Sequence, residues 1–185
     1  SHYSLTNLDG LENLQHIGDQ LAIENNNVLV DIGGLQNLVT VGGSVEIRFN
    51  NMLPDLDGLI GLSVVENWLQ IRFNDSLENL DGFSGLIEVG GGVEVRDNPS
   101  LESVEGMNGL NALRDLQISD NATLPNLDGL GNVSQVEFDV SISKNANLAS
   151  LGGLSGLESL GGRFSLLQND VLENLDGLEN LVSIG

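Results

Sequence analysis

The sequence contains no cysteine, which excludes a disulfide framework, a thiolate zinc site and a cysteine nucleophile. Basic residues are scarce, because only six lysines and arginines accompany 27 aspartates and glutamates, and the formal net charge is -21. A chain this acidic repels the phosphate backbone of nucleic acids and does not dock on anionic lipid by charge. Because no long apolar run is present either, we expect neither nucleic acid nor the membrane interior as a partner.

What the sequence has in abundance is an internal repeat. Eight glycines are separated by 24 residues, except for one separation of 23, and they are Gly10, Gly34, Gly58, Gly82, Gly106, Gly129, Gly153 and Gly177. The missing residue falls between Leu113 and Leu116. A fixed period of this length is typical of solenoids. Nothing interrupts the array, so we predict a single domain over residues 1–185. The sequence begins within a repeat, so we expect a fragment of a longer protein with flanking domains.

Each repeat carries two apolar residues two positions apart, which is the period of a β-strand. Leu69 and Ile71 are expected to point into a core, while Gln70 and Arg72 point outward. The pattern predicts seven main strands, at Leu21–Ile23, Val45–Ile47, Leu69–Ile71, Val93–Val95, Leu116–Ile118, Val140–Ile142 and Phe164–Leu166. Glycine and asparagine interrupt every helical run. We therefore predict an all-β fold, a right-handed parallel β-solenoid (β-helix) of leucine-rich repeats with seven main-sheet rungs.

Two recurring positions indicate turns. An asparagine follows each strand, at Asn26, Asn50, Asn74, Asn98, Asn121, Asn145 and Asn169, and stacked at a strand spacing of about 4.8 Å these side chains are expected to bond to each other and to the backbone. Three residues after each repeat glycine stands Asn or Gly, namely Asn13, Asn37, Gly61, Gly85, Gly109, Asn132, Gly156 and Asn180. That choice predicts a left-handed turn residue in every coil.

The repeats resemble a known family. Leu8-Asp9-Gly10-Leu11-Glu12-Asn13-Leu14, followed by Ile17-Gly18 and Leu21-Ala22-Ile23, is similar to the leucine-rich β-helical repeat of receptor L-domains, found in growth-factor receptor ectodomains and in bacterial surface proteins. Because the receptor versions carry cysteines, the resemblance favours a bacterial surface protein or adhesin. It implies an extracellular or cell-surface location and a role in cell adhesion or ligand binding.

The candidate site is the outward face of rungs two to four. Trp68, the only tryptophan, lies there with an arginine column, an adjacent polar column and two phenylalanines at the strand exits: Arg48, Arg72 and Arg96; Glu46, Gln70 and Glu94; Phe49 and Phe73. Aromatic faces beside arginines and carboxylates suit a glycan or a peptide. The competing interpretation is a surface ion-pair network in which Glu24, Glu46 and Glu94 offset the arginines, which is worth little per pair.

Other sites are less well supported by the sequence. Asp57, Asp81, Glu105 and Asp128 precede repeat glycines and form an acidic column that could bind calcium, although Asp-Gly is also ordinary turn chemistry. A β-helix can act on polysaccharides as an enzyme, with Glu46 and Glu94 as acid and base, but a flat face gives no water-excluding cleft. His2 and His16 are not near these glutamates in the repeat register.

The sequence therefore predicts a non-enzymatic extracellular module without a cofactor, which binds a glycan or a peptide of another surface on its main sheet. The alternatives are a passive spacer in a large surface protein and a polysaccharide-active enzyme.

Overall fold

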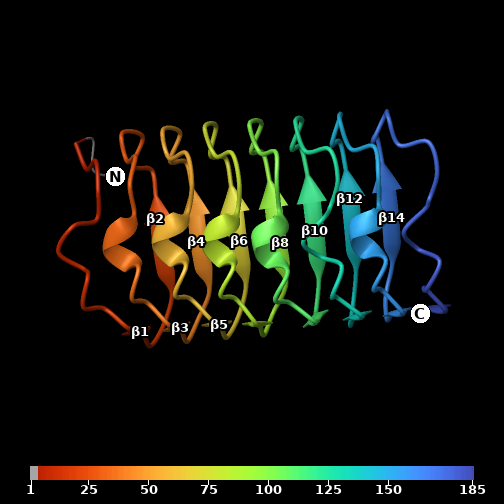
Figure 1. Ribbon diagram of the computed structural model, residues 1–185, viewed down its shortest axis with the longest axis horizontal. Helices are drawn as coiled ribbons and strands as arrows, with labels where there is room; N and C mark the ends of the chain where they lie inside the picture. Colours follow the sequence, from red (N-terminus) through yellow and green to blue (C-terminus); the bar gives the residue numbers. More distant parts are fainter. Residues whose placement is uncertain (1–3) are drawn as a thin grey trace.

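The computed structural model describes residues 4–185 as a parallel β-solenoid with one coil per repeat (Figure 1). Its main sheet consists of β2 (Leu21–Glu24), β4 (Val45–Arg48), β6 (Leu69–Arg72), β8 (Val93–Arg96), β10 (Leu116–Ser119), β12 (Val140–Ser143) and β14 (Phe164–Leu167). Each strand extends one residue beyond its predicted end. In Figure 1 the chain rises through these strands and descends on the opposite side as it advances, which is a right-handed winding. The predicted fold and seven rungs are confirmed.

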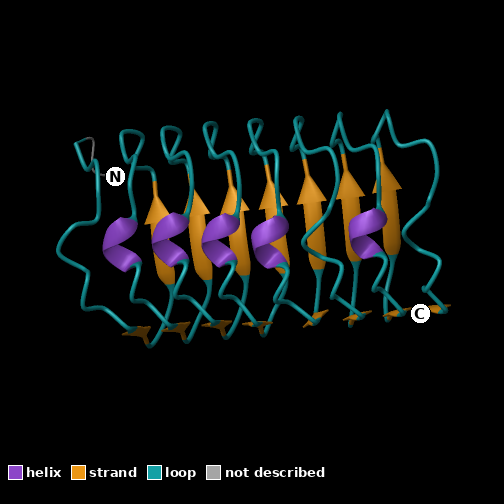
Figure 2. Cartoon of the chain, in the orientation of Figure 1, coloured by secondary structure: helices purple, strands orange, loops and turns teal. Residues whose placement is uncertain are grey.

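The side opposite the main sheet carries short 3-10 helices, which Figure 2 shows as single helical turns facing the strands. Five are present in residues 4–185: η1 (Gly33–Leu35), η2 (Asp57–Leu59), η3 (Asp81–Phe83), η4 (Glu105–Met107) and η5 (Gly152–Leu154). Each contains one of the repeat glycines. A Cβ atom on Gly82 would collide with the carbonyl oxygen of Leu56 in the preceding coil, so the glycine permits the close approach of two backbones.

A third side is formed by two-residue strands, which make two separate sheets. One contains β1 (His16–Ile17), β3 (Thr40–Val41), β5 (Val64–Val65) and β7 (Glu88–Val89), and the other contains β9 (Ala112–Leu113), β11 (Gln135–Val136), β13 (Ser159–Leu160) and β15 (Ser183–Ile184). The break between β7 and β9 is called the seam below.

The seam coincides with the single short repeat. Leu113 pairs with Val136 and Val93 pairs with Leu116, each 23 residues apart, whereas Leu116 pairs with Val140 at 24. The missing residue therefore lies between Leu113 and Leu116, as the sequence predicted. With one residue fewer in that turn, the chain reaches the main sheet in register and leaves β7 and β9 unpaired.

The core runs the length of the solenoid as one cluster, mainly of leucine, isoleucine and valine with Phe83 and Met107. Leu69 and Ile71 are completely buried, as are the equivalent strand residues of the neighbouring coils. Each coil thus buries its apolar face against the next, and stability is close to a sum of terms between neighbours.

The asparagine ladder is present as predicted. Asn74 is completely buried, and its side-chain amide donates to the carbonyl oxygens of Ile47 at 3.0 Å and Arg72 at 3.1 Å. Its side-chain oxygen accepts the backbone N–H of Asn50 at 3.1 Å. The ladder therefore supplies hydrogen-bond partners for backbone groups at the corner where the chain leaves the main sheet.

The predicted position of the left-handed residue is wrong. Neither the Asn nor the Gly residues three after each repeat glycine have positive φ. The non-glycine residues with positive φ directly follow the main strands, at φ values from 55 to 58, and they are Asn25, Phe49, Phe73, Asp97, Asp120, Lys144 and Gln168. Three repeat glycines, Gly10, Gly129 and Gly177, also have positive φ. Close packing explains the Asn and Gly instead. The Asn37 side chain donates to the Glu12 carbonyl oxygen at 2.7 Å, and a Cβ on Gly61 would lie 2.7 Å from the Gln36 carbonyl oxygen.

Candidate functional site

The register of the main sheet places the candidate residues as the sequence predicted. Arg48 pairs with Arg72 and Arg72 with Arg96, so the three arginines form one column. Glu46, Gln70 and Glu94 form the adjacent column on the same face. Charged side chains at strand spacing interact strongly only with near neighbours, so their contacts decide whether the arginines are free.

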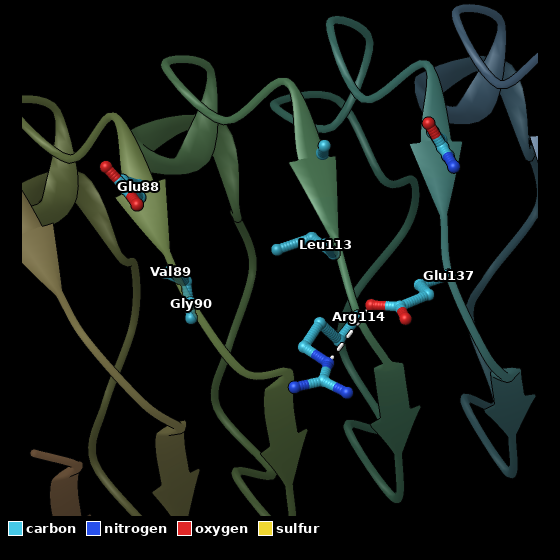
Figure 3. Close-up of a pocket in the computed structure, with 8 residues that line it drawn as sticks. Glu88, Val89, Gly90, Leu113, Arg114 and Glu137 are labelled. Atoms are coloured by element: carbon cyan, nitrogen blue, oxygen red, sulfur yellow. Dashed lines mark ion pairs between the residues drawn. The ribbon is translucent and has the colours of Figure 1, made fainter.

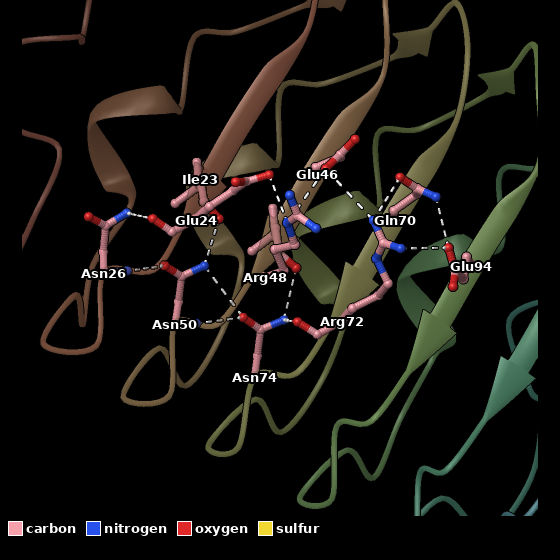
Figure 4. Close-up of polar contacts among 11 residues, drawn as sticks. Ile23, Glu24, Asn26, Glu46, Arg48, Asn50, Gln70, Arg72, Asn74 and Glu94 are labelled. Carbon is pink, nitrogen blue, oxygen red and sulfur yellow. Dashed lines mark hydrogen bonds and ion pairs between the residues drawn. The ribbon is translucent and has the colours of Figure 1, made fainter. Parts of the chain in front are cut away.

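Arg72 is held down on the sheet at the centre of this face (Figure 4). Its guanidinium donates to Gln70 Oε1 at 3.1 Å and lies 3.5 Å from Glu94 Oε2 and 3.7 Å from Glu46 Oε2. Only 15% of the Arg72 side chain is exposed. Gln70 also donates to Glu94 Oε2 at 2.8 Å. Arg72 is therefore a fixed centre of the network and has little surface left for a ligand.

Arg48 and Arg96 flank this centre and are more exposed, at 35% and 40% of their side chains. Arg48 donates from Nε to Glu24 Oε1 at 2.8 Å, and this contact lowers the pKa of Glu24 and raises the pKa of Arg48. Arg96 Nε approaches Glu94 Oε1 to 2.8 Å as an ion pair but lacks the alignment of a hydrogen bond. The ion-pair network proposed as the competing interpretation is thus present.

Phe49 and Phe73 form a stacked pair at the strand exits. Their ring centroids are 4.8 Å apart and the planes are 4° from parallel, because both residues adopt the same left-handed conformation in successive coils. The Arg96 guanidinium lies 5.2 Å from the centroid of Phe73. Arginine over an aromatic face is a favourable contact. Through the contact between Arg96 and Phe73, the two phenylalanines therefore extend the network to the C-terminal ends of the main strands.

Trp68 is half-buried and lies along the sheet instead of projecting from it. A Cβ on Gly92 would lie 2.6 Å from Trp68 Cζ3 and 2.7 Å from Cη2, so the six-membered ring covers Gly92. The equivalent positions of the neighbouring coils carry the small residues Ser44 and Gly92, and the ring uses the room over Gly92 to cover that glycine. The result is an aromatic side chain held close against the main-sheet face.

Rungs five to seven of the same face are built differently, and the sequence did not predict a site there. The hydroxyls of Ser141 and Ser165 and the amide of Gln117 have no hydrogen-bond partner among residues 4–185, and Arg163 there makes no ion pair. A hollow of about 240 Å³ opens over Ser141, Ser165, Asp139 and Arg163. The serines at the outward strand positions of these rungs, among them Ser141 and Ser165, were the available signal.

A second hollow, of about 340 Å³, lies at the seam on the short-sheet side (Figure 3). Val89 and Leu113 line it from the two unpaired strands, and Arg114 closes one end through an ion pair with Glu137 at 3.1 Å. Both partners of this pair are more than half exposed. The hollow is the direct result of the short repeat and contains none of the predicted site residues.

The acidic column lies on the 3-10 side. Asp57 and Asp81 begin η2 and η3, and both are exposed, as is Asp128. Burial, Asp55 and Asp81 together raise the pKa of Asp57. No group of three His, Asp or Glu side chains in residues 4–185 is arranged to hold a metal ion. The column is therefore a set of mutually repelling carboxylates without the six to eight oxygen ligands of a calcium site.

The residues considered for catalysis are not assembled. Glu46 and Glu94 both contact Arg72, so each carboxylate is already engaged. His16 belongs to a short strand, where its Nδ1 lies 2.8 Å from Thr40 Oγ1. His2 lies outside the described residues. Within the described chain, no helix is long and apolar enough to cross a membrane.

No family model, no curated protein and no solved structure matches this chain.

Proposed function

We propose that the chain is a non-enzymatic recognition module that binds a glycan on the outward face of its main sheet. The observation that carries the proposal is the position of Trp68 over Gly92, beside the network of Gln70, Arg72 and Glu94. An aromatic face flanked by fixed hydrogen-bonding groups is suited to a sugar ring, which has an apolar face and polar edges.

The charge distribution supports the same face. Four of the six basic residues point outward from the main sheet, where they accompany five carboxylates: Arg48, Arg72, Arg96 and Arg163 with Glu24, Glu46, Glu94, Asp115 and Asp139. This face therefore has one net negative charge, and the remaining twenty are spread over the other surfaces. The negative field is therefore weakest on this face, and binding here needs no positive charge on the partner.

A glycan is favoured over a peptide because the site offers side chains and no open backbone. The backbone groups of the interior main strands pair with the strands on both sides, so an extended peptide finds no strand edge on this face. The fixed network also reduces the cost of ordering side chains on binding.

The resemblance to receptor L-domains and bacterial surface proteins supports an extracellular, cell-surface role in adhesion as part of this proposal. In that setting the glycan belongs to another surface. Flanking domains of the same chain would present the module.

The experiment is a glycan array probed with the wild-type protein and with Trp68→Ala. We expect the signal to fall at least tenfold in the variant, since a stacked aromatic at the centre of an interface contributes more than about 1.4 kcal/mol. Phe138→Ala is the matched control, because Phe138 is an exposed aromatic on another surface beside Arg114. Equal glycan signals from the wild type and Trp68→Ala would overturn the assignment of the site to Trp68, and no glycan signal from correctly folded protein would support a passive spacer or a peptide ligand instead.

A further inference from the structure

The main-sheet face consists of two halves that differ in how their polar groups are used. In rungs one to four the arginines and carboxylates engage each other, as Arg48 does with Glu24 and Arg96 with Glu94. In rungs five to seven, Gln117, Ser141 and Ser165 have no partner among residues 4–185. In the first half most polar groups engage each other, although the buried Nε atoms of Arg72 and Arg96 have no hydrogen-bond partner, whereas the second half has free donors and acceptors on accessible side chains.

Backbone contacts hold the carboxylates of the second half in fixed positions. Asp139 Oδ1 accepts the backbone N–H of Arg163 at 2.7 Å, and Asp115 Oδ1 accepts that of Asp139 at 3.3 Å. Each carboxylate therefore keeps its other oxygen, Oδ2, free of these bonds. Asp139, Ser141, Ser165 and Arg163 together line the hollow of about 240 Å³ with acceptors, hydroxyls and one guanidinium.

Trp68 and the hollow lie on one line along the solenoid axis. The indole covers Gly92 in the fourth rung, and the hollow lies between the sixth and seventh rungs, which is two to three strand spacings away, about 10 to 14 Å. The outward residues between them are Asp115, in the column of Trp68, and Gln117, in the adjacent column, both with free polar atoms. A ligand that reaches both places must be an extended chain of several rings.

We infer that the ligand is a linear, uncharged oligosaccharide that runs along the solenoid axis, stacked on Trp68 and hydrogen-bonded in the hollow by Asp139, Ser141 and Ser165. Vicinal sugar hydroxyls both donate and accept, which matches carboxylate, hydroxyl and amide groups at strand spacing. An anionic glycan would approach through the field of twenty negative charges on the surrounding surfaces and find the arginines of the first half already paired. This inference rests on the proposed function and adds the class of glycan and a second subsite.

The experiment is calorimetric titration with linear uncharged oligosaccharides at two lengths. The probes are the hexaoses and bioses of β-1,4-glucan, β-1,4-xylan, β-1,4-mannan and β-1,3-glucan, with oligogalacturonate hexamer as the acidic comparison. We expect at least one hexaose to bind about tenfold or more tightly than its biose, because only the hexaose spans both subsites.

Two variants assign the second subsite. Ser141→Ala with Ser165→Ala is expected to weaken the hexaose about tenfold and to leave the biose unchanged, because two hydrogen bonds to the ligand are lost in the hollow alone. Ser143→Ala is the control, since Ser143 lies on the same strand β12 outside the lining of the hollow. Trp68→Ala should weaken both lengths.

The outcomes separate the two proposals. If a hexaose binds through Trp68 but the double serine variant binds it equally well, the second subsite is wrong and the proposed function stands. If only the acidic hexamer binds, the uncharged class of ligand is wrong and the proposed function stands. If none of these oligosaccharides binds the folded protein while the glycan array gives a signal that depends on Trp68, this inference falls and the proposed function stands. If the array gives no signal either, both fall.

Discussion

At the scale of single residues, the buried asparagines are the polar groups on which the fold depends most. Asn74, Asn98 and their equivalents replace water as partners of the backbone where each coil turns away from the main sheet. Removing one leaves several buried partners unsatisfied together, and this costs more than the loss of a single exposed hydrogen bond.

Asn74→Ala is expected to destabilise the protein by about 2 to 4 kcal/mol, because it removes the donors to Ile47 and Arg72 and the acceptor for Asn50 in a fully buried position. Urea unfolding followed by circular dichroism measures the change. Asn147→Ala, an exposed asparagine two residues beyond the ladder position, should shift the curve by less than about 0.5 kcal/mol. Equal effects of the two substitutions would contradict a special role for the ladder.

The carboxylate of Asp57, unlike the buried asparagines, lowers the stability of the folded state when it is ionised. Because its pKa is raised in the folded state, chiefly by burial and then by Asp55 and Asp81, the ionised form is disfavoured there. The folded state is therefore favoured when Asp57 is protonated, and this contribution is lost as the pH rises through the folded-state pKa.

We accordingly expect Asp57→Asn to raise the urea midpoint at pH 7. The gain in the free energy of unfolding should be below about 1 kcal/mol, because the group is exposed. The gain should disappear as the pH falls below 3.8, the ordinary value for aspartate, since Asp57 is then protonated in both states. Asp170→Asn, an exposed acid near the end of the chain, controls for net charge. A midpoint that falls in Asp57→Asn at pH 7 would show that the carboxylate stabilises its turn.

At the scale of elements, the seam shows what one residue does to a repeat array. The main sheet continues across the short repeat without interruption, whereas the short sheet divides between β7 and β9. The pairing of the four-residue strands is thus preserved and that of the two-residue strands is lost. The reason is that the four-residue strands bury more of the core and form more backbone hydrogen bonds.

Inserting one glycine between Arg114 and Asp115 restores the 24-residue spacing. We expect β7 and β9 to pair, the hollow to close and the stability to rise by about 1 to 2 kcal/mol, the contribution of two backbone hydrogen bonds. Hydrogen exchange should show slower exchange at the amides of Val89 and Ala112. The matched control inserts glycine between Glu66 and Asn67, in a coil of full length, and should destabilise; a stabilising control would mean that the added flexibility, not the spacing, is responsible.

At the scale of the whole molecule, charge and function are linked through the main-sheet face. The chain holds its coils together by apolar contacts while most of its surface is acidic, so self-repulsion opposes the folded state. On the outward face of the main sheet the positive and negative charges nearly cancel, and we place the ligand there. The rest of the surface keeps the molecule apart from other acidic molecules.

Salt should therefore stabilise this protein. Raising sodium chloride from about 0.1 M to about 1 M shortens the Debye length from about 10 Å to about 3 Å and screens the acidic surfaces. We expect the thermal midpoint to rise, and to rise less in a variant with Asp57, Asp81, Glu105 and Asp128 replaced by their amides. A midpoint that falls with salt would mean that the ion pairs around Arg72 contribute more to stability than the repulsion removes.

The period of the sequence determined most of the fold. Spacing by two and by 24 fixes which residues are buried and which coils are neighbours, so the strands, the columns of Arg72 and Gln70, the asparagine ladder and the short repeat all follow from the sequence. The left-handed residue did not follow from it, because Phe49, Phe73 and Lys144 are not typical of that conformation and adopt it through the ladder and the stacking of coils.

Only the tertiary structure decided what the outward side chains do. The sequence places Trp68, Arg72 and Glu94 on one face. Whether an arginine is free or paired, however, depends on side-chain rotamers and on differences of about an ångström in the distance between charged atoms, which the spacing of residues does not encode. The same holds for the indole over Gly92 and for the hollow at Ser141 and Ser165, which exists because small side chains lie beside larger ones in adjacent coils. Periodicity fixes neighbours along and across the sheet, and packing fixes which of their atoms remain available to a ligand.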